Sequence, residues 1–149
     1  MSVSPFNIFV GETIGTFFLT SSIIYMTNFE NGGQATNILG LIVGFFIAVN
    51  ITRKISGANL NPAVTLLFFF KDNEKNNNKN SCDYTRVLIY MGAQFLGAFF
   101  AVLLGLLLYN NLIVLSINQN SNPFSAFTME YLGSCLFYLI ILVQCKHLY

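Results

Sequence analysis

The sequence predicts an all-α integral membrane protein with four transmembrane helices and one re-entrant half-helix. Of its 149 residues, 54% are hydrophobic and only 9% are charged, whereas an ordinary soluble domain carries about a quarter charged residues. The charges are spaced so that four apolar runs approach the ~20 residues needed to cross a bilayer. A fifth apolar run is far too short to cross, and it follows a polar loop that ends in Asn-Pro.

Four apolar runs are the candidate spans. They are Ile8–Thr27, Asn31–Thr52, Val87–Tyr109 and Phe124–Cys145. The first is interrupted only by Glu12 and the last only by Glu130, and the other two carry no charge. The segment 110–123, between the third and fourth runs, is rich in Asn and Ser and predicts a loop.

The short apolar run, Val64–Phe70, follows the polar sequence Ser-Gly-Ala-Asn-Leu-Asn-Pro. Asn61 suits the N-cap of a helix and Pro62 suits its first turn, which predicts a half-helix over 61–70. Such a helix either enters the bilayer and turns back, where its backbone lines a cavity or is buried in protein, or lies on the membrane surface. The local pattern leaves both readings open.

The distribution of basic residues favours re-entry. Cytoplasmic loops collect Lys and Arg. If the half-helix enters and leaves on one side, all seven Lys and Arg of the chain fall on one face of the membrane. If it crossed, they would be divided between the two faces. We therefore expect a multi-pass protein with both termini and the polar linker 71–83 on the cytoplasmic side.

An internal repeat relates the first and fourth runs. Glu12-Thr-Ile-Gly opens the first, and Glu130-Tyr-Leu-Gly opens the fourth, 118 residues later. One period holds three spans and the half-helix, so the two copies have opposite orientations in the membrane. Inverted repeats of this kind are typical of transporters and channels.

The segment Ile55–Thr65 (ISGANLNPAVT) resembles the first NPA loop of the aquaporin and glycerol-channel family, the major intrinsic proteins. Glu-x-x-Gly-Thr at Glu12 and YMGAQFLGA at Tyr90–Ala98 resemble that family's first and third helices. The resemblance implies one truncated aquaporin-like domain over 1–149. Its parts are a first repeat at 1–117, which contains the half-helix 61–70 and the loop 71–83, and the first helix of a second repeat at 124–146. Most of the second repeat, with its NPA half-helix and filter arginine, is lacking.

The resemblance also implies a channel for water and/or small neutral solutes such as glycerol, in a lipid bilayer, with a pore inside each subunit of a homo-tetramer or larger assembly. The residues expected at the pore are Leu41, Phe45, Gly57, Ala58, Asn59, Asn61, Pro62, Ala63 and Val64. Leu41 aligns with the family's outer constriction, where an aromatic residue or His is frequent, so an aliphatic residue favours a wider opening. Asn59 stands where the family commonly has His.

Elementary chemistry agrees with a pore for neutral solutes. Unwound backbone at 57–59 offers carbonyl acceptors. Asn61 can cap its helix with the side-chain oxygen and keep its NH2 group for a solute. The helix N-terminus carries a partial positive charge of about half a unit, which disfavours a cation at that point.

The two intramembrane acids have two readings. An acid at the bilayer centre costs about 2.5–3.5 kcal/mol, so Glu12 and Glu130 are either interfacial anchors or, as the resemblance implies, buried acceptors for hydrogen bonds from loop backbone. We expect the second. Gln94 is expected to join helices through a hydrogen bond rather than to line the pore.

Other classes of function are disfavoured. A net charge of +1 creates no strong positive potential that would attract nucleic acid. Three Cys and one His share no metal-ligand spacing, so we expect no metal and no cofactor. The acidic, basic and metal-ligating side chains of the sequence do not gather in one place, as the active site of an enzyme requires. The chain is then a truncated aquaporin, a half-channel completed by another copy or chain, or a non-conducting accessory subunit that retains the half-fold; as a pore on its own it is expected to be incomplete.

Overall fold

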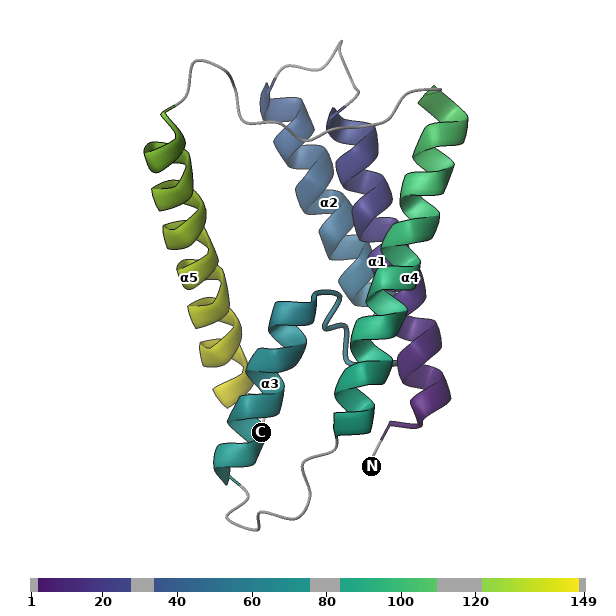
Figure 1. The fold of residues 1–149 in the computed structure, drawn as a ribbon, viewed down its shortest axis with the longest axis vertical. Coiled ribbons are helices and arrows are strands. Elements are labelled where there is room, and N and C mark those ends of the chain that lie inside the picture. Colours follow the sequence, from purple (N-terminus) through teal and green to yellow (C-terminus); the bar gives the residue numbers. More distant parts are fainter. Residues whose placement is uncertain (1–2, 28–33, 76–83, 110–121, 148–149) are drawn as a thin grey trace. The chain divides into compact units, whose positions relative to one another are not determined.

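The computed structural model describes residues 3–27, 34–75, 84–109 and 122–147. These residues contain five helices and no strand (Figure 1). The helices are α1 (Pro5–Thr27), α2 (Gln34–Thr52), α3 (Pro62–Lys75), α4 (Tyr84–Tyr109) and α5 (Pro123–His147). The chain divides into two compact units, Met1–Ile113 and Val114–Tyr149, which are described separately.

Proline marks the start of three helices. The chain has three prolines, and each is the first residue of a helix: Pro5, Pro62 and Pro123. Proline suits this position because it needs no intrahelical donor there and its φ is already helical. The preceding Ser or Asn side chain accepts a hydrogen bond from the backbone N–H two or three residues on, in all three cases. Short-range signals therefore set these three boundaries.

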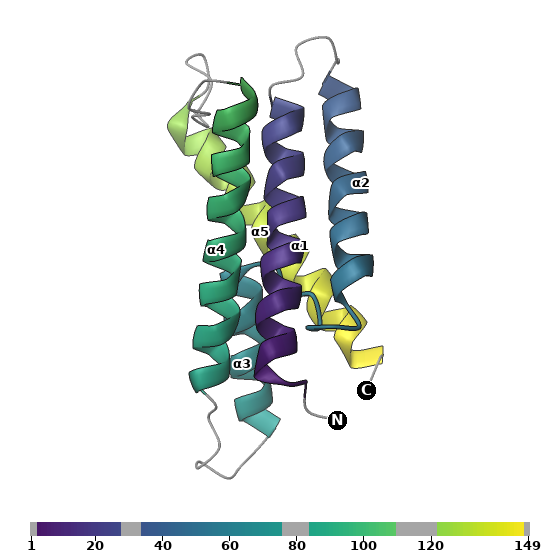
Figure 2. The ribbon, with the colours of Figure 1, turned by 90° about the vertical axis from the view of Figure 1, so that its right-hand side faces the viewer.

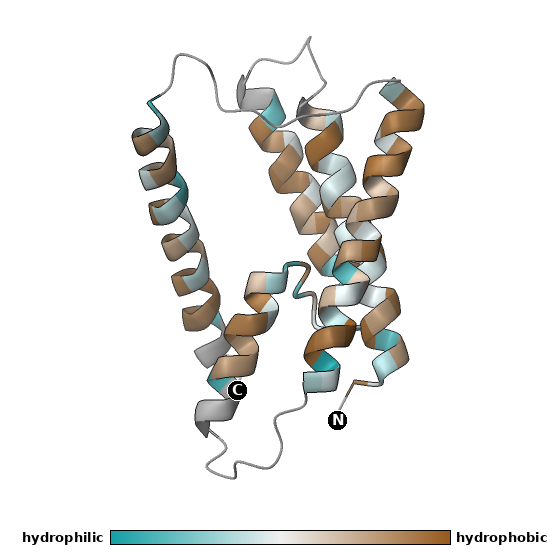
Figure 3. Cartoon of the chain, viewed as in Figure 1, coloured by the Kyte–Doolittle hydropathy of each residue, from teal (hydrophilic) through white to brown (hydrophobic). Residues whose placement is uncertain are grey.

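Helices α1, α4 and α5 are long and apolar enough to cross a membrane. Brown, apolar residues predominate along α2, α4 and α5 in Figure 3. Large side chains such as Phe46 and Phe95 are about two-thirds exposed, as expected where lipid is the solvent. The chain is thus an α-helical integral membrane protein. The apolar parts of α2 and α3 are shorter, at Asn37–Thr52 and Pro62–Lys71, so the second crossing and the re-entry of the half-helix remain predictions.

In the first unit α1 lies between α2 and α4 (Figure 2). Small residues allow the close approach. A Cβ on Gly97 of α4 would overlap the carbonyl oxygen of Thr13 on α1, and a Cβ on Gly44 of α2 would overlap the side chain of Ser22. Glycine at such crossings lets helices pack backbone to backbone in a membrane. The helix α1 is therefore fixed from both sides.

Helix α3 begins about halfway along α4 and runs toward the end of the unit where the N-terminus lies (Figure 1). It packs on α4, where the rings of Phe69 and Tyr84 lie 5.3 Å apart. It continues past Phe70 to Lys75, so the first five residues of the expected polar linker are helical. Lys and Glu are good helix formers, and no Gly or Pro interrupts them. The rest of that linker, 76–83, lies outside the described residues.

Candidate functional site

The loop between α2 and α3 has an unusual backbone. Its φ angles are +98° at Gly57, +57° at Ala58 and +52° at Leu60. Glycine adopts such angles readily, but for residues with a Cβ the left-handed region costs about 1–2 kcal/mol each. The loop needs hydrogen bonds from its surroundings to keep this shape.

Glu12 of α1 accepts three of them. Its side chain is fully buried. Oε1 accepts hydrogen bonds from Ser56 Oγ at 2.7 Å and from the Asn59 N–H at 3.0 Å. Oε2 accepts from the Leu60 N–H at 2.7 Å and from Gln94 Nε2 at 2.8 Å. An ionised carboxylate has about four acceptor positions, so these four donors fill the carboxylate and compensate its burial.

Thr65, in the first turn of α3, is a second residue at which several hydrogen bonds meet. Its Oγ1 accepts hydrogen bonds from Asn59 Nδ2 at 3.3 Å and from Gln94 Nε2 at 3.0 Å, and it donates to the carbonyl of Asn61 at 3.2 Å. Gln94, on α4, is 1% exposed and joins Thr65 to Glu12. Three helices, α1, α3 and α4, therefore meet at one buried polar cluster.

A third contact reaches the loop from α4. The Tyr90 hydroxyl donates to the carbonyl of Ser56. The Gly57 N–H donates to the carbonyl of Arg53 at 3.2 Å, and the Ala58 N–H donates to Ser56 Oγ at 3.2 Å. The loop is thus bound on two sides, by the acid of α1 and by the phenol of α4.

Several polar groups of the loop have no hydrogen-bond partner among the described residues. The carbonyls of Gly57, Ala58 and Asn59 accept no hydrogen bond from any residue that the structure describes. Asn61 Oδ1 accepts from the Ala63 N–H at 2.8 Å and so caps α3, while Asn61 Nδ2 has no acceptor among the described residues. Gly57 is exposed, and Asn59 and Asn61 are half-buried. Three acceptors and one donor of the loop thus have no partner in the part of the chain that the structure describes.

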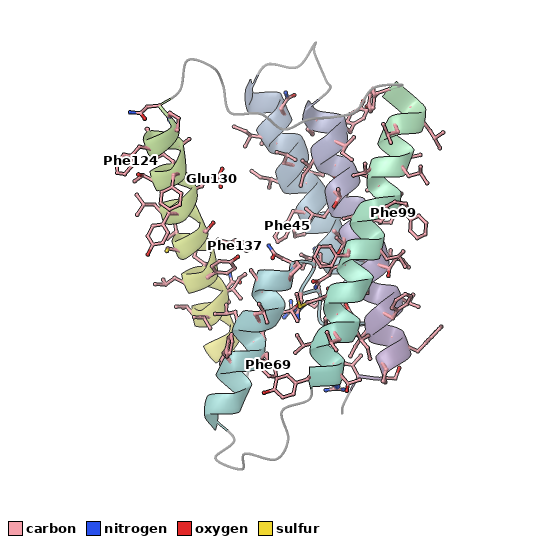
Figure 4. The ribbon with its side chains drawn as sticks, in the orientation of Figure 1. Phe45, Phe69, Phe99, Phe124, Glu130 and Phe137 are labelled. Carbon is pink, nitrogen blue, oxygen red and sulfur yellow. The ribbon has the colours of Figure 1, made fainter. Side chains whose placement is uncertain are left out.

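The other expected pore residues lie in different environments. Pro62 is half-buried and Ala63 is exposed at the start of α3, whereas Val64 is only 4% exposed. Leu41, half-buried, and Phe45, exposed, belong to α2. Figure 4 shows Phe45 near the level at which α3 begins.

Glu130 lies on α5, in the second unit, and its side chain is exposed there (Figure 4). Its expected burial against a loop stays a prediction. Within the described ranges, no three His, Cys, Asp or Glu side chains gather as a metal site would require.

Sequence reasoning singled out neither Thr65 nor Tyr90 as a site residue, although both lie inside segments that resemble the family. Gln94 was expected only to join helices. Thr65 stands four residues after Asn61, one helical turn away, which places it over the cap. That spacing is the signal that could have identified it. Nothing local indicates Tyr90, because its partner lies 34 residues earlier.

The sequence matches a known protein family and several of its curated members. The profile of the major intrinsic protein family matches residues 45–147, which include the loop, α3, α4 and α5. A glycerol uptake facilitator protein of Buchnera aphidicola subsp. Acyrthosiphon pisum is 43% identical over 79 residues, or 53% of this chain and 27% of that protein. Its counterpart in Buchnera aphidicola subsp. Schizaphis graminum is 35% identical over 108 residues, or 70% of this chain and 37% of that protein.

A plant relative aligns with nearly the whole chain. The probable aquaporin NIP7-1 of Arabidopsis thaliana is 27% identical over 153 aligned positions, which cover 99% of this chain and 52% of that protein. The chain thus spans between about a quarter and a half of the length of these curated relatives. No solved structure gives a significant match. Since the family profile covers more than half of the sequence, the chain belongs to the major intrinsic protein family.

Proposed function

We propose that this chain supplies part of the wall of a membrane channel for water and/or small neutral solutes such as glycerol. One observation carries the proposal. Among the described residues, the carbonyls of Gly57, Ala58 and Asn59 and the NH2 group of Asn61 have no hydrogen-bond partner, while Glu12 holds the N–H groups of Asn59 and Leu60 in the same loop. The names of the bacterial relatives, glycerol uptake facilitators, support glycerol as one such solute.

The chemistry of these groups suits a neutral polyol or water. A hydroxyl group can donate to a carbonyl and accept from an amide NH2, so a solute that passes the loop exchanges its water hydrogen bonds for these. The N-terminus of α3, next to Asn61, adds a partial positive charge that opposes cations. No covalent step is required, and the activity proposed is transport rather than catalysis.

The proposed arrangement in the membrane follows the sequence. In it α2 also crosses, α3 enters from the cytoplasmic face and returns, and both termini are cytoplasmic. The first repeat then occupies 1–117, and α5 is the first helix of a second repeat, with Glu130 in the role that Glu12 has in the first. Leu41, Phe45 and Val64 would complete the apolar side of the pore.

We further propose that these 149 residues do not enclose a pore alone. They contain one NPA segment, and a single-file path needs a wall on every side. A homo-tetramer of complete channels, with the remaining wall supplied by further sequence or by another chain, is the assembly that family membership favours. The alternative role is that of a non-conducting accessory membrane subunit that retains the same half-fold.

A chimera tests conduction. The chain through α5 would be joined to the remainder of the Buchnera relative and reconstituted in vesicles, and glycerol and water fluxes would be followed by stopped-flow light scattering. We expect flux above that of empty vesicles. A matched chimera with Asn61→Ala should assemble but lose glycerol flux. A folded tetrameric chimera without any flux would argue for the accessory role.

A further inference from the structure

One peptide unit of the loop is held at both ends. The carbonyl of Ser56 accepts a hydrogen bond from the Tyr90 hydroxyl, and the N–H of the same unit, on Gly57, donates to the carbonyl of Arg53 at 3.2 Å. The unit stands immediately before the three free carbonyls. Its orientation determines the direction in which the rest of the loop leaves α2.

The backbone of Gly57 does not by itself hold the Ser56–Gly57 peptide unit in this orientation. Gly57 has a φ of +98°, and the only atom within 4 Å of a Cβ built there is the Tyr90 hydroxyl oxygen, at 3.8 Å. Glycine occupies positive and negative φ with similar ease. The backbone of Gly57 therefore imposes little preference of its own on this unit, and the hydrogen bond from Tyr90 is the contact that holds its carbonyl.

Glu12 cannot replace this contact. The acid binds Ser56 through its side chain and the loop through the N–H groups of Asn59 and Leu60. It has no donor with which to bind a carbonyl. The two contacts are complementary, since the carboxylate of α1 binds donors of the loop and the phenol of α4 binds an acceptor, the Ser56 carbonyl.

We propose that Tyr90 is a positioning residue of the pore, whose hydroxyl fixes the plane of the Ser56–Gly57 peptide and thereby the direction of the next carbonyl, that of Gly57. The carbonyls of Ala58 and Asn59 belong to peptide units whose N–H groups Glu12 already holds. The importance of that direction for solutes rests on the proposed function. The backbone effect itself does not, and it can be measured without any solute.

The sequence offers a selective label. Ser56–Gly57 is the only Ser-Gly pair in the chain. A protein made with carbonyl-13C serine and 15N glycine thus contains a single directly bonded 13C–15N pair, and solid-state NMR of the chain in lipid bilayers can observe that peptide alone. A second sample, with carbonyl-13C glycine and 15N alanine, reports the three Gly-Ala pairs at Gly57, Gly92 and Gly97.

The test compares wild type, Tyr90→Phe and Tyr84→Phe. Because a hydrogen bond deshields a carbonyl carbon, Tyr90→Phe should move the Ser56 signal upfield, and it should shift or split the Gly57 signal as the unit rotates. The Gly97 signal, within α4, should stay in place. Tyr84→Phe removes an exposed hydroxyl from the same helix, and it should leave all these signals unchanged.

Three results would overturn the proposal. An unchanged Ser56 signal in Tyr90→Phe would remove the hydrogen bond as its basis. A shifted Ser56 signal with an unchanged Gly57 signal would show that Tyr90 binds the carbonyl without orienting the loop. Movement of the Gly97 signal as well would assign Tyr90 a general role in packing. Failure of the chimera to conduct, with the expected NMR shifts, would refute the channel and leave the positioning role intact.

Discussion

Glu12 and Leu60 lie 48 residues apart in the sequence, and the carboxylate of the first accepts a 2.7 Å hydrogen bond from the backbone N–H of the second. Leu60 has left-handed backbone and is 3% exposed. The contact thus joins a buried acid in the first helix to a strained position just before the half-helix.

We expect Glu12→Gln to destabilise the chain. The side-chain NH2 group of glutamine would replace either Oε1 or Oε2. In either place it would face donors rather than acceptors, and the donors at Oε2 include the Leu60 N–H. A buried donor left without an acceptor costs about 1–3 kcal/mol. Unfolding in detergent should shift to lower temperature, with faster proteolysis of the loop. Glu130→Gln, at an exposed position, is the control. Equal stability of the two variants would contradict the role of Glu12.

Thr65→Val should also destabilise the protein. Valine keeps the shape of threonine but leaves the amides of Asn59 and Gln94 without their shared acceptor. We expect a loss of about 1–3 kcal/mol, because Gln94 is buried. Thr65→Ser retains the hydroxyl and should recover most of this loss in the same denaturation assay. If serine were as damaging as valine, the methyl group rather than the hydrogen bonds would be responsible.

Two substitutions of Asn61 separate its cap from its free amide. Asn61→Ala removes the side-chain oxygen that accepts from the Ala63 N–H, and loss of an N-cap costs about 0.5–2 kcal/mol. Asn61→Asp keeps the cap and should be close to wild type in thermal unfolding. In the conducting chimera both lose the NH2 donor, so both should lower glycerol flux. Wild-type flux in the Asp variant would show that this donor is not used.

The 149-residue chain alone should give vesicles no selective permeability. Water and glycerol fluxes, measured by stopped-flow shrinkage, are expected to equal those of empty vesicles, since one half-helix leaves the path open on one side. The chimera serves as the positive control. Fast water flux with a low activation energy from the chain alone would mean that copies of it close a pore between them.

The basic residues predict the side on which Cys82 lies, although this residue is outside the described part of the chain. A membrane-impermeant thiol reagent should label Cys82 only from the cytoplasmic face. The variant Cys82→Ser identifies the labelled site against Cys135 and Cys145. Labelling of Cys82 from outside sealed cells would invalidate the predicted topology.

The helices could be predicted more fully than the site. Apolar runs and the Ser-Pro and Asn-Pro pairs are local signals. They identify the first residues of three helices, Pro5, Pro62 and Pro123, within a few residues. The sequence pattern predicts too early an end for α3, because the polar residues after Phe70 are typical of a linker, although nothing in Lys71–Lys75 breaks a helix.

The loop conformation has no comparable local signal. Alanine and leucine disfavour left-handed backbone, so the φ angles of Ala58 and Leu60 cannot be deduced from their neighbours in sequence. They depend on Glu12, Gln94 and Tyr90, which lie far away along the chain. For Glu12 the residues alone left an interfacial anchor equally open, and only the family resemblance favoured a buried acceptor.

The separation between Glu12 and its partners also has a consequence for biosynthesis. The chain is made from its N-terminus, so Glu12 leaves the ribosome before the donors of Ser56, Asn59 and Leu60, which follow 44 to 48 residues later, and long before Gln94, 82 residues later. A first helix inserted at once would hold its acid without these partners, at about 2.5–3.5 kcal/mol if central. The carboxylate of α1 therefore gains its buried partners only after the loop and α4 have been made, so the stability of the first helix depends on segments synthesised later.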